Sequence, residues 1–272
     1  MGLMAALVLV CIAGPANLQG QPGGWIESAE AARIDWTAAL VIATGTHCRG
    51  ANALNAARQA ARSSLARAVM AVQVDGRRRI ADLAEGNPGL AARLAELAAG
   101  ARVIDETAPS DGPASATVAL SLTGALSKLV LPQELREVQP VQPVGAAALS
   151  AAPEEGRSGL LVDARGTDLR PAMVLTIRDE NGVEVFGPAF VSREFAVQSG
   201  MCVYLTDFEA ARREARLGKN PLVIRALRSA GPRRTELIVT RTDAAALHGA
   251  STHLAFLRTC RVVVVLDPPP RG

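Results

Sequence analysis

Residues 158–204 read SGLLVDARGTDLRPAMVLTIRDENGVEVFGPAFVSREFAVQSGMCVY, and this stretch decides the fold of the second half of the chain. It consists of short apolar runs separated by turn residues, a pattern typical of strands. Asn181-Gly182 lies between two of these runs and predicts a hairpin turn, because both residues tolerate a positive φ. The turn explains the polar residues here better than a cation site built on Asp179 and Glu180 does.

Strands and helices continue to alternate after this stretch. The expected strands are at 160–164, 172–178, 183–186, 201–205, 222–226, 235–241 and 262–266, and the expected helices are at 192–198, 207–217 and from 242 or 243 to about 257. We expect Ser192 and Asp207 to cap the first two of these helices, since their side-chain oxygens accept hydrogen bonds from free backbone N–H groups. Residues 158–267 therefore predict an α/β domain with a mixed sheet, followed by a tail at 268–272.

Residues 25–131 predict a separate α/β unit at the start of the chain. Alternating apolar residues from Arg33 to Thr44 indicate one half-buried strand that ends at Gly45. Further along, the sequence predicts a long amphipathic helix at 52–72, a short helix ending at Glu85, a helix at 88–99 that Asn87-Pro88 begins, and a strand pair at 101–107 and 115–122 around the turn-rich PSDGP. The expected order is β-α-α-α-β-β.

The segment 132–157 is rich in proline and small residues and shows no helical or strand periodicity, which predicts a linker. The chain has 272 residues, of which 49% are hydrophobic, enough for two small cores. We therefore expect an α/β (α+β) fold with two small two-layer α/β domains, 25–131 and 158–267, joined by this Pro-rich linker.

The first 16 residues, MGLMAALVLVCIAGPA, predict a signal peptide. Their apolar run is too short for a bilayer span, and Gly14 and Ala16 form a small-x-small cleavage site. The run lacks a basic n-region, so either the signal is atypical or the true start codon lies upstream. Acylation at Cys11 is an alternative that Val10 disfavours, since a lipobox needs a small residue there. A buried first helix of a cytoplasmic protein is a second alternative.

The composition argues against several classes of function. The net charge is only +3, far from the concentrated excess that a phosphate backbone demands, so nucleic acid is a poor candidate partner. Aromatic residues make up 3% of the chain, which argues against an aromatic-lined ligand pocket. The sequence contains no nucleotide-binding or hydrolase motif. We therefore assign no catalytic, cofactor-binding or metal-ligating residue and expect no cofactor.

The cysteines and histidines do not form a recognisable motif. Cys48, Cys202 and Cys260 remain after signal cleavage, without a CxxC pair, and we favour buried free thiols over a disulfide between Cys202 and Cys260. His248 and His253 are five residues apart on an expected helix, so they lie on different faces and do not predict a metal site.

Two charged segments leave alternatives open. Asp163, Arg165 and Asp168 follow an expected strand, where local salt bridges are the simpler account. The alternative is a hydrolase-like site, which requires a raised carboxyl pKa in a closed pocket. The arginine triplet 77–79 is explained equally by a solvated helix end and by contacts with anionic lipid, glycan or an acidic partner.

The first unit resembles the N-terminal domain shared by flagellar assembly protein T and the LPP-type bacterial envelope lipoproteins. The matching elements are IDWTAALVIATG, AARQAARSSLARAV, GARVIDE and ATVALSLTG. The second unit resembles the following domain of exported proteins of the same group, through GLLVDARG, RPAMVLTIRDENGVEVFG and SREFAVQSGM. The resemblance implies an exported envelope protein, often lipid-anchored, that takes part in assembly or surface structures and has no assigned enzymatic chemistry.

Together these observations predict an exported, non-enzymatic cell-envelope protein, periplasmic or associated peripherally with the outer membrane. It would act in the assembly or structure of an envelope or surface complex, with flagella as one setting, through an envelope protein partner or self-association. One alternative is a periplasmic small-ligand or glycan-binding module with a concave groove between the domains. Another is the hydrolase-like enzyme with its site near Asp163 to Asp168.

Overall fold

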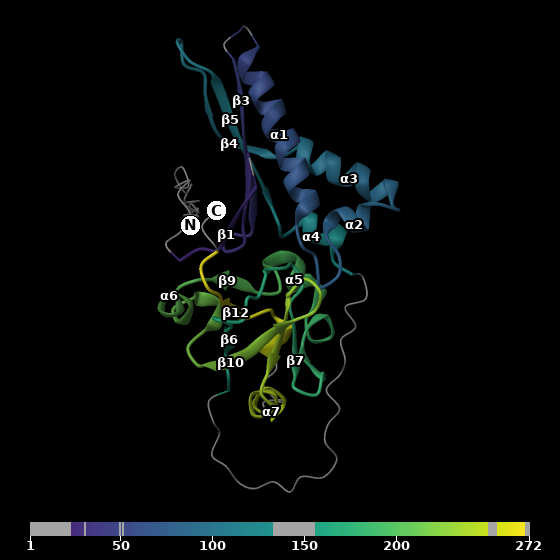
Figure 1. Cartoon of the computed structure of the whole chain (residues 1–272), viewed down its shortest axis with the longest axis vertical. Coiled ribbons are helices and arrows are strands. Elements are labelled where there is room, and N and C mark those ends of the chain that lie inside the picture. The colour runs from purple at the N-terminus through teal and green to yellow at the C-terminus, as the bar shows by residue number, and fades with distance from the viewer. Residues whose placement is uncertain are drawn as a thin grey trace, which may run out of the picture.

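The computed structural model describes residues 23–29, 31–48, 50, 52–132, 156–249 and 255–269. The expected signal peptide and almost all of the expected linker lie outside these residues. The described chain forms two sheets with helices packed against them, which confirms the α/β fold class (Figure 1). We call residues 23–132 the first unit and residues 156–269 the second unit.

The first unit is built on an antiparallel sheet of five strands in the order β1-β2-β3-β5-β4. The strands are β1 (Ile26–Ala29), β2 (Ala32–Asp35), β3 (Leu40–His47), β4 (Arg102–Thr107) and β5 (Ala114–Ser121), and the helices are α1 (Ala53–Ala71), α2 (Ile80–Ala84), α3 (Pro88–Ala99) and α4 (Ala125–Val130). The first three helices and the β4–β5 pair were predicted, whereas β1 and α4 were not. Helix α1 packs along β3 and β5 because its alanines and Leu65 form one buried stripe.

The prediction of one strand from Arg33 to Thr44 is wrong. The chain reverses between β2 and β3, and Asp35 Oδ1 accepts hydrogen bonds from the N–H groups of Thr37 and Ala38 at 3.1 and 2.8 Å. Ala39 completes the turn with φ 53°. The apolar alternation continues through this turn because Trp36 is itself buried, so the pattern conceals the reversal.

The sequence predicted that Gly45 ends a strand. In the structure Gly45 lies inside β3, where α1 crosses the strand. A Cβ atom at this position would lie 2.3 Å from both the carbonyl oxygen of Ala57 and the amide nitrogen of Ala61. Both atoms belong to the helix backbone and cannot yield as a flexible side chain can. Gly45 therefore allows the close approach of α1 and β3.

The second unit is built on a mixed sheet of seven strands in the order β8-β7-β11-β10-β6-β12-β9. The strands are β6 (Gly159–Asp163), β7 (Thr176–Asp179), β8 (Glu184–Phe186), β9 (Val203–Leu205), β10 (Pro221–Ala230), β11 (Glu236–Val239) and β12 (Val262–Val265), and the helices are α5 (Arg193–Ser199), α6 (Phe208–Arg212), α7 (Arg241–Gly249) and α8 (Ala255–Arg258), with single 3₁₀ turns η1 (Pro188–Phe190) and η2 (Ala215–Leu217). Strand β6 pairs in parallel with β10 and β12. The predicted mixed sheet is confirmed, as is the hairpin turn at Asn181-Gly182, where Gly182 has φ 83°.

Two predicted helices differ from the structure. The helix expected at 207–217 begins as predicted, with Ala210 N–H donating to Asp207 Oδ1 at 2.8 Å. It breaks into α6 and η2 because Glu214 adopts an extended backbone, and Leu217 then reaches the apolar cluster on β6 and β12. The last helix begins at Arg241, and its cap is the Thr240 hydroxyl, not Thr242 or Asp243. Residues 250–254, between α7 and α8, are outside the described chain.

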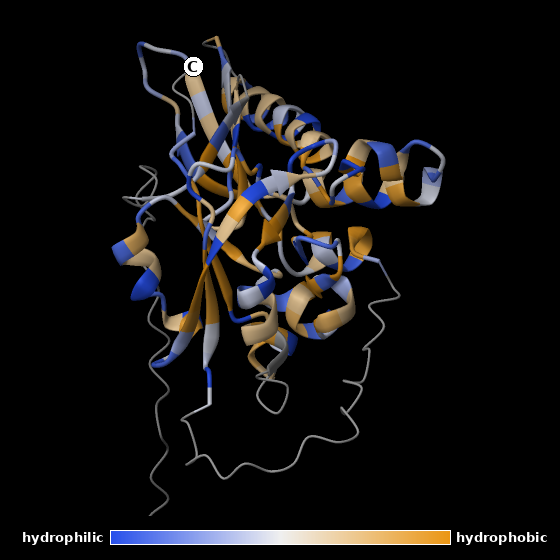
Figure 2. Ribbon diagram, turned by 60° about the horizontal axis from the view of Figure 1, so that its bottom comes forward, coloured by the Kyte–Doolittle hydropathy of each residue, from blue (hydrophilic) through white to orange (hydrophobic). Residues whose placement is uncertain are grey.

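The buried apolar residues continue from one unit into the other. A single cluster contains Trp36 and Leu65 of the first unit together with Val162 and Val264 of the second, where composition alone suggested two cores. Figure 2 shows hydrophobic strand segments, in orange, in the middle of the molecule. The two units therefore pack against each other through buried apolar surface.

We expect Gly45→Ala to lower the free energy of unfolding by about 1–3 kcal/mol, because overpacking at a backbone contact forces α1 away from β3. The matched control is Gly86→Ala, since nothing lies within 4 Å of a Cβ atom there. We expect the control to change stability by less than about 0.5 kcal/mol. Urea denaturation of both variants measures the difference, and equal stabilities would refute the close-approach argument.

Candidate functional site

The turn between β2 and β3 meets β9 at a fully buried tyrosine. The ring of Tyr204, which is 1% exposed, packs edge-on against Trp36 with 6.0 Å between the ring centroids. Thr37 Oγ1 accepts a hydrogen bond from Trp25 N–H at 2.9 Å and donates to the Tyr204 carbonyl at 2.6 Å. The Tyr204 hydroxyl accepts from Ala172 N–H at 3.2 Å and donates to the Ala172 carbonyl at 2.9 Å. This tyrosine therefore joins the two units, with both its hydroxyl and its carbonyl partnered.

Backbone hydrogen bonds extend the junction on one side of this tyrosine. Met173 N–H donates to the Gln73 carbonyl at 3.0 Å, and Val174 N–H donates to the Val74 carbonyl at 2.8 Å. The segment that follows α1 thus lies beside the segment that precedes β7. Paired backbone groups in a buried junction fix the relative position of the two segments.

The start of the described chain closes the edge of the second sheet. Gly24 forms an antiparallel bridge with Leu205 at the end of the edge strand β9. Trp25 Nε1 donates to the Asp267 carbonyl at 3.2 Å, just after β12. The first residues of one unit therefore cover strand ends of the other.

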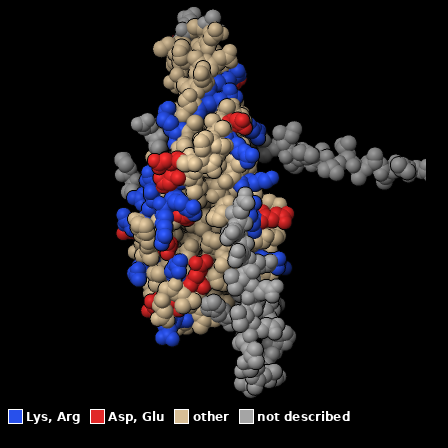
Figure 3. Space-filling view, turned by 90° about the vertical axis from the view of Figure 1, so that its right-hand side faces the viewer, with Lys and Arg blue, Asp and Glu red and all other residues tan. Residues whose placement is uncertain are grey.

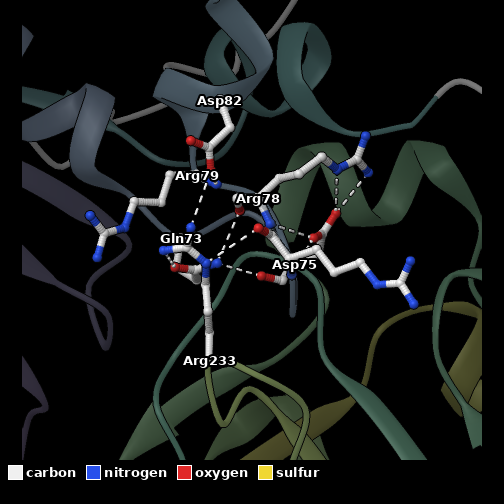
Figure 4. Close-up of polar contacts among 7 residues, drawn as sticks. Gln73, Asp75, Arg78, Arg79, Asp82 and Arg233 are labelled. Atoms are coloured by element: carbon white, nitrogen blue, oxygen red, sulfur yellow. Dashed lines mark hydrogen bonds and ion pairs between the residues drawn. The ribbon is translucent and has the colours of Figure 1, made fainter.

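An arginine from the second unit reaches into the first unit at α2 (Figure 4). Arg233, in the turn between β10 and β11, donates to the Arg77 carbonyl at 3.2 Å, to Gln73 Oε1 at 3.5 Å and to Asp82 Oδ2 at 3.4 Å. Figure 4 also shows the guanidinium of Arg79 directed away from these contacts. The side chain of Arg79 therefore takes no part in this link between the units.

The arginine triplet has three different roles in this arrangement. Arg78 forms an ion pair with Asp75 at 2.7 Å, and burial would raise the pKa of this carboxyl group, but hydrogen bonds from Arg78 and from backbone N–H groups lower it overall. Arg77 supplies the carbonyl that Arg233 contacts. Arg79 alone lines a cavity at the junction.

Two neighbouring cavities lie where the units meet, and we call them together the junction cleft. The first has a volume of about 300 Å³ and is lined by Arg79, Arg170, Arg233 and Arg234, with Glu27 as its acidic residue. The second has a volume of about 280 Å³ and shares Arg170 and Arg234 with the first. On the face drawn in Figure 3, basic side chains gather at mid-height, the level at which the two units meet in Figure 1.

The turn between β10 and β11 holds the shared arginines together. Arg234 has φ 55°, in the left-handed region that residues other than glycine seldom adopt, and its carbonyl accepts a hydrogen bond from Arg170 N–H at 2.7 Å. Its guanidinium lies 3.5 Å from a carboxyl oxygen of Asp168, which is largely exposed. Solvent screens an ion pair of this kind, so it contributes little to stability.

The structure separates the residues of the hydrolase hypothesis. Asp163 pairs with Arg165 at 2.7 Å, which confirms the local salt bridge, and the hydrogen bond from Arg165 lowers the pKa of this carboxyl group. Asp168 instead pairs with Arg234. The raised carboxyl pKa that the hypothesis requires is not found at Asp163. Burial raises the pKa of a different carboxyl group, Glu184, which lies 3.6 Å from Arg178 on the neighbouring strand.

The described cysteines are free thiols, as predicted, but of the three only Cys260 is buried, and Cys202 is half-buried. Burial raises the pKa of Cys202 to about 11, although Tyr204 and Arg216 lower it, and raises the pKa of Cys260 to about 12. Cys48 is exposed. In the described chain, no group of three or more His, Cys, Asp or Glu residues is arranged to hold a metal ion.

The structure describes one of the three histidine side chains and the predicted helix cap at Ser192. His47 is exposed on the end of β3, whereas the side chains of His248 and His253 lie outside the described residues. Ser192 precedes α5 as predicted, but its side chain makes no capping hydrogen bond, so the reason given for this helix start is wrong.

Residues 159–268, which include the whole seven-stranded sheet, match a protein-family model described as Treponema pallidum Tp0624, second domain. The match covers the second unit, and the first unit lies outside it. No curated protein matches the chain. Among the described helices, none combines the length and apolar composition needed to cross a membrane.

We expect a thiol-alkylating reagent at pH 8 to modify Cys48 in the native protein and to reach Cys202 and Cys260 only after unfolding, because the thiolate is the reactive form. Above pH 9 the unfolded chain loses the protons of Cys202 and Cys260 before the folded chain does, since their folded pKa values are raised from 9.0. The free energy of unfolding should therefore fall between pH 9 and about 11. Peptide mass mapping measures the labelling, and equal rates at Cys48 and Cys260 would contradict the burial.

Proposed function

We propose that this chain is an exported, non-enzymatic protein of the bacterial cell envelope that takes part in assembling an envelope or surface complex, and that it recognises its partner at the junction cleft. The observation that supports this proposal is the arginine-lined cleft where the two units meet. Export, localisation and the link to assembly rest on the predicted signal peptide and on the family resemblance. Flagella are one setting consistent with that resemblance.

The arginines of the cleft are arranged for binding. Arg79 and Arg170 are exposed, and neither forms an ion pair with a described residue. A guanidinium presents five donors in a fixed plane, which suits carboxylate and phosphate groups, and arginine is enriched among the residues that dominate binding energy. Such groups contribute more to binding an external partner than to stabilising the fold.

The cleft is set in a junction that resists relative motion of its walls. The Tyr204 contacts, the backbone pairs at 73–74 and 173–174, and the Arg233 link surround it on the two units. A site whose walls are already positioned loses less conformational entropy on binding than one that closes around its partner. This supports a docking role for the two units acting together.

A second candidate function is a small-ligand or glycan-binding module. The sequence-based version of this alternative required a concave groove between the units, and the junction cleft has that position. The two candidates differ in what the cleft binds: an envelope protein in the first case, a small molecule or glycan in the second. The hydrolase alternative has less support, because Asp163 is held in an ion pair with Arg165.

Two measurements on cells that express the tagged full-length chain test the proposal. Fractionation followed by intact mass should find the chain in the envelope fraction, cleaved after Ala16. A photo-crosslinking residue at Arg234, on the cleft rim, should then capture an envelope protein, whereas the same residue at Ala245, exposed on α7 at the other end of the second unit, should not. An uncleaved cytosolic chain, or equal capture from both positions, would overturn the proposal.

A further inference from the structure

We infer that the junction cleft binds an oxyanion, a phosphate or carboxylate group carried on an uncharged body, between Arg79, Arg170 and Arg234. This inference deepens the proposed function, since it names the chemistry that the same cleft recognises.

The first cavity has an excess of positive charge. Four arginines line it against one acid, Glu27. The carboxylate of Glu27 accepts a hydrogen bond from Trp36 Nε1 at 3.4 Å, which draws it toward the tryptophan. The guanidinium of Arg233 is engaged with Gln73 and Asp82. The positive charge that remains for a ligand therefore comes from Arg79 and Arg170, and from Arg234, whose ion pair with the largely exposed Asp168 is screened by solvent.

The second cavity is balanced in charge and has apolar walls. Arg170 and Arg234 face Asp168 and Asp267, so its formal charges cancel. Asp267 is further engaged, because its Oδ2 accepts a hydrogen bond from Gly166 N–H at 2.6 Å. The other lining residues are mostly apolar, among them Trp25. A neutral group fits this cavity better than a second anion does.

The cleft occupies the edge of the sheet at which α/β proteins commonly bind ligands. Strands β6 and β12 are parallel neighbours, and Ala164 and Leu266, the residues that follow them, line the second cavity. Ligands of open α/β sheets bind outside the carboxyl ends of the strands. The position of the cleft thus agrees with its charge.

The two cavities meet at Arg170 and Arg234, which line both. A ligand that spans them places its anion against the three arginines and its uncharged body against the apolar walls. Arginine binds both carboxylate and phosphate through paired N–H···O bonds, stronger than those between neutral groups. Because Arg79 belongs to the first unit and the other two arginines to the second, the bound anion also bridges the units.

Isothermal titration calorimetry of the mature chain tests the inference with three soluble probes: inorganic phosphate, glycerol 3-phosphate and acetate, each at fixed ionic strength. We expect binding of at least one probe, and tighter binding of glycerol 3-phosphate than of inorganic phosphate because its body enters the second cavity. Arg79→Gln and Arg170→Gln should each weaken this binding about tenfold or more, the loss expected for a hydrogen bond to a charged group. Both side chains are exposed, so the variants should keep the fold, which circular dichroism checks.

The charge-matched control is Arg241→Gln, on α7 at the far end of the second unit, which should leave binding unchanged (Figure 1). A vesicle arm separates the two sources of the oxyanion. Binding of phosphatidylglycerol vesicles that is lost in Arg79→Gln, without binding of soluble probes, would assign the oxyanion to a lipid headgroup.

The inference is overturned if neither the soluble probes nor the vesicles bind, or if Arg241→Gln weakens binding as much as Arg79→Gln. Failure here is distinguishable from failure of the proposed function. Crosslinks from the cleft rim in an envelope fraction, without any oxyanion binding, would leave the assembly role standing and refute the ligand chemistry alone.

Discussion

The buried contact between the β2–β3 turn and Tyr204 holds the two units in one arrangement. A phenol hydroxyl and a backbone carbonyl inside the core need partners, and Ala172 and Thr37 provide them. A buried polar group left without a partner costs about 1–3 kcal/mol. The hydroxyl is satisfied within the second unit, whereas the carbonyl depends on Thr37 of the first unit and so favours one arrangement of the two units. The edge-on packing of Trp36 on the same ring adds apolar contact to this polar constraint.

This constraint also creates the cleft. With the turn fixed against β9, the segment after α1 lies beside the segment before β7, and Arg233 reaches α2. Arg79 then faces a cavity that Arg170 and Arg234 line from the other unit. The positive charge at the junction therefore depends on how the units are joined, and neither unit has this cavity by itself.

The sequence predicted the local elements well and the junction poorly. The stripe on α1, the Asn87 cap and the hairpin at Asn181-Gly182 follow from interactions within a few residues, which periodicity and turn chemistry describe. The β2–β3 turn was missed because a buried Trp36 continues the apolar alternation. In the sequence, the triplet that contains Arg79 is recognisable only as a run of positive charge. Its contact with Arg233, through the Arg77 carbonyl, joins residues more than 150 positions apart, and no spacing rule predicts a contact over that separation.

The contacts around Tyr204 join the two units into one cooperative body. Differential scanning calorimetry of the chain measures this cooperativity. We predict a single unfolding transition whose calorimetric and van't Hoff enthalpies agree, because loss of either unit exposes the core and the polar groups of the other. Two separable transitions, one for each sheet, would contradict the account.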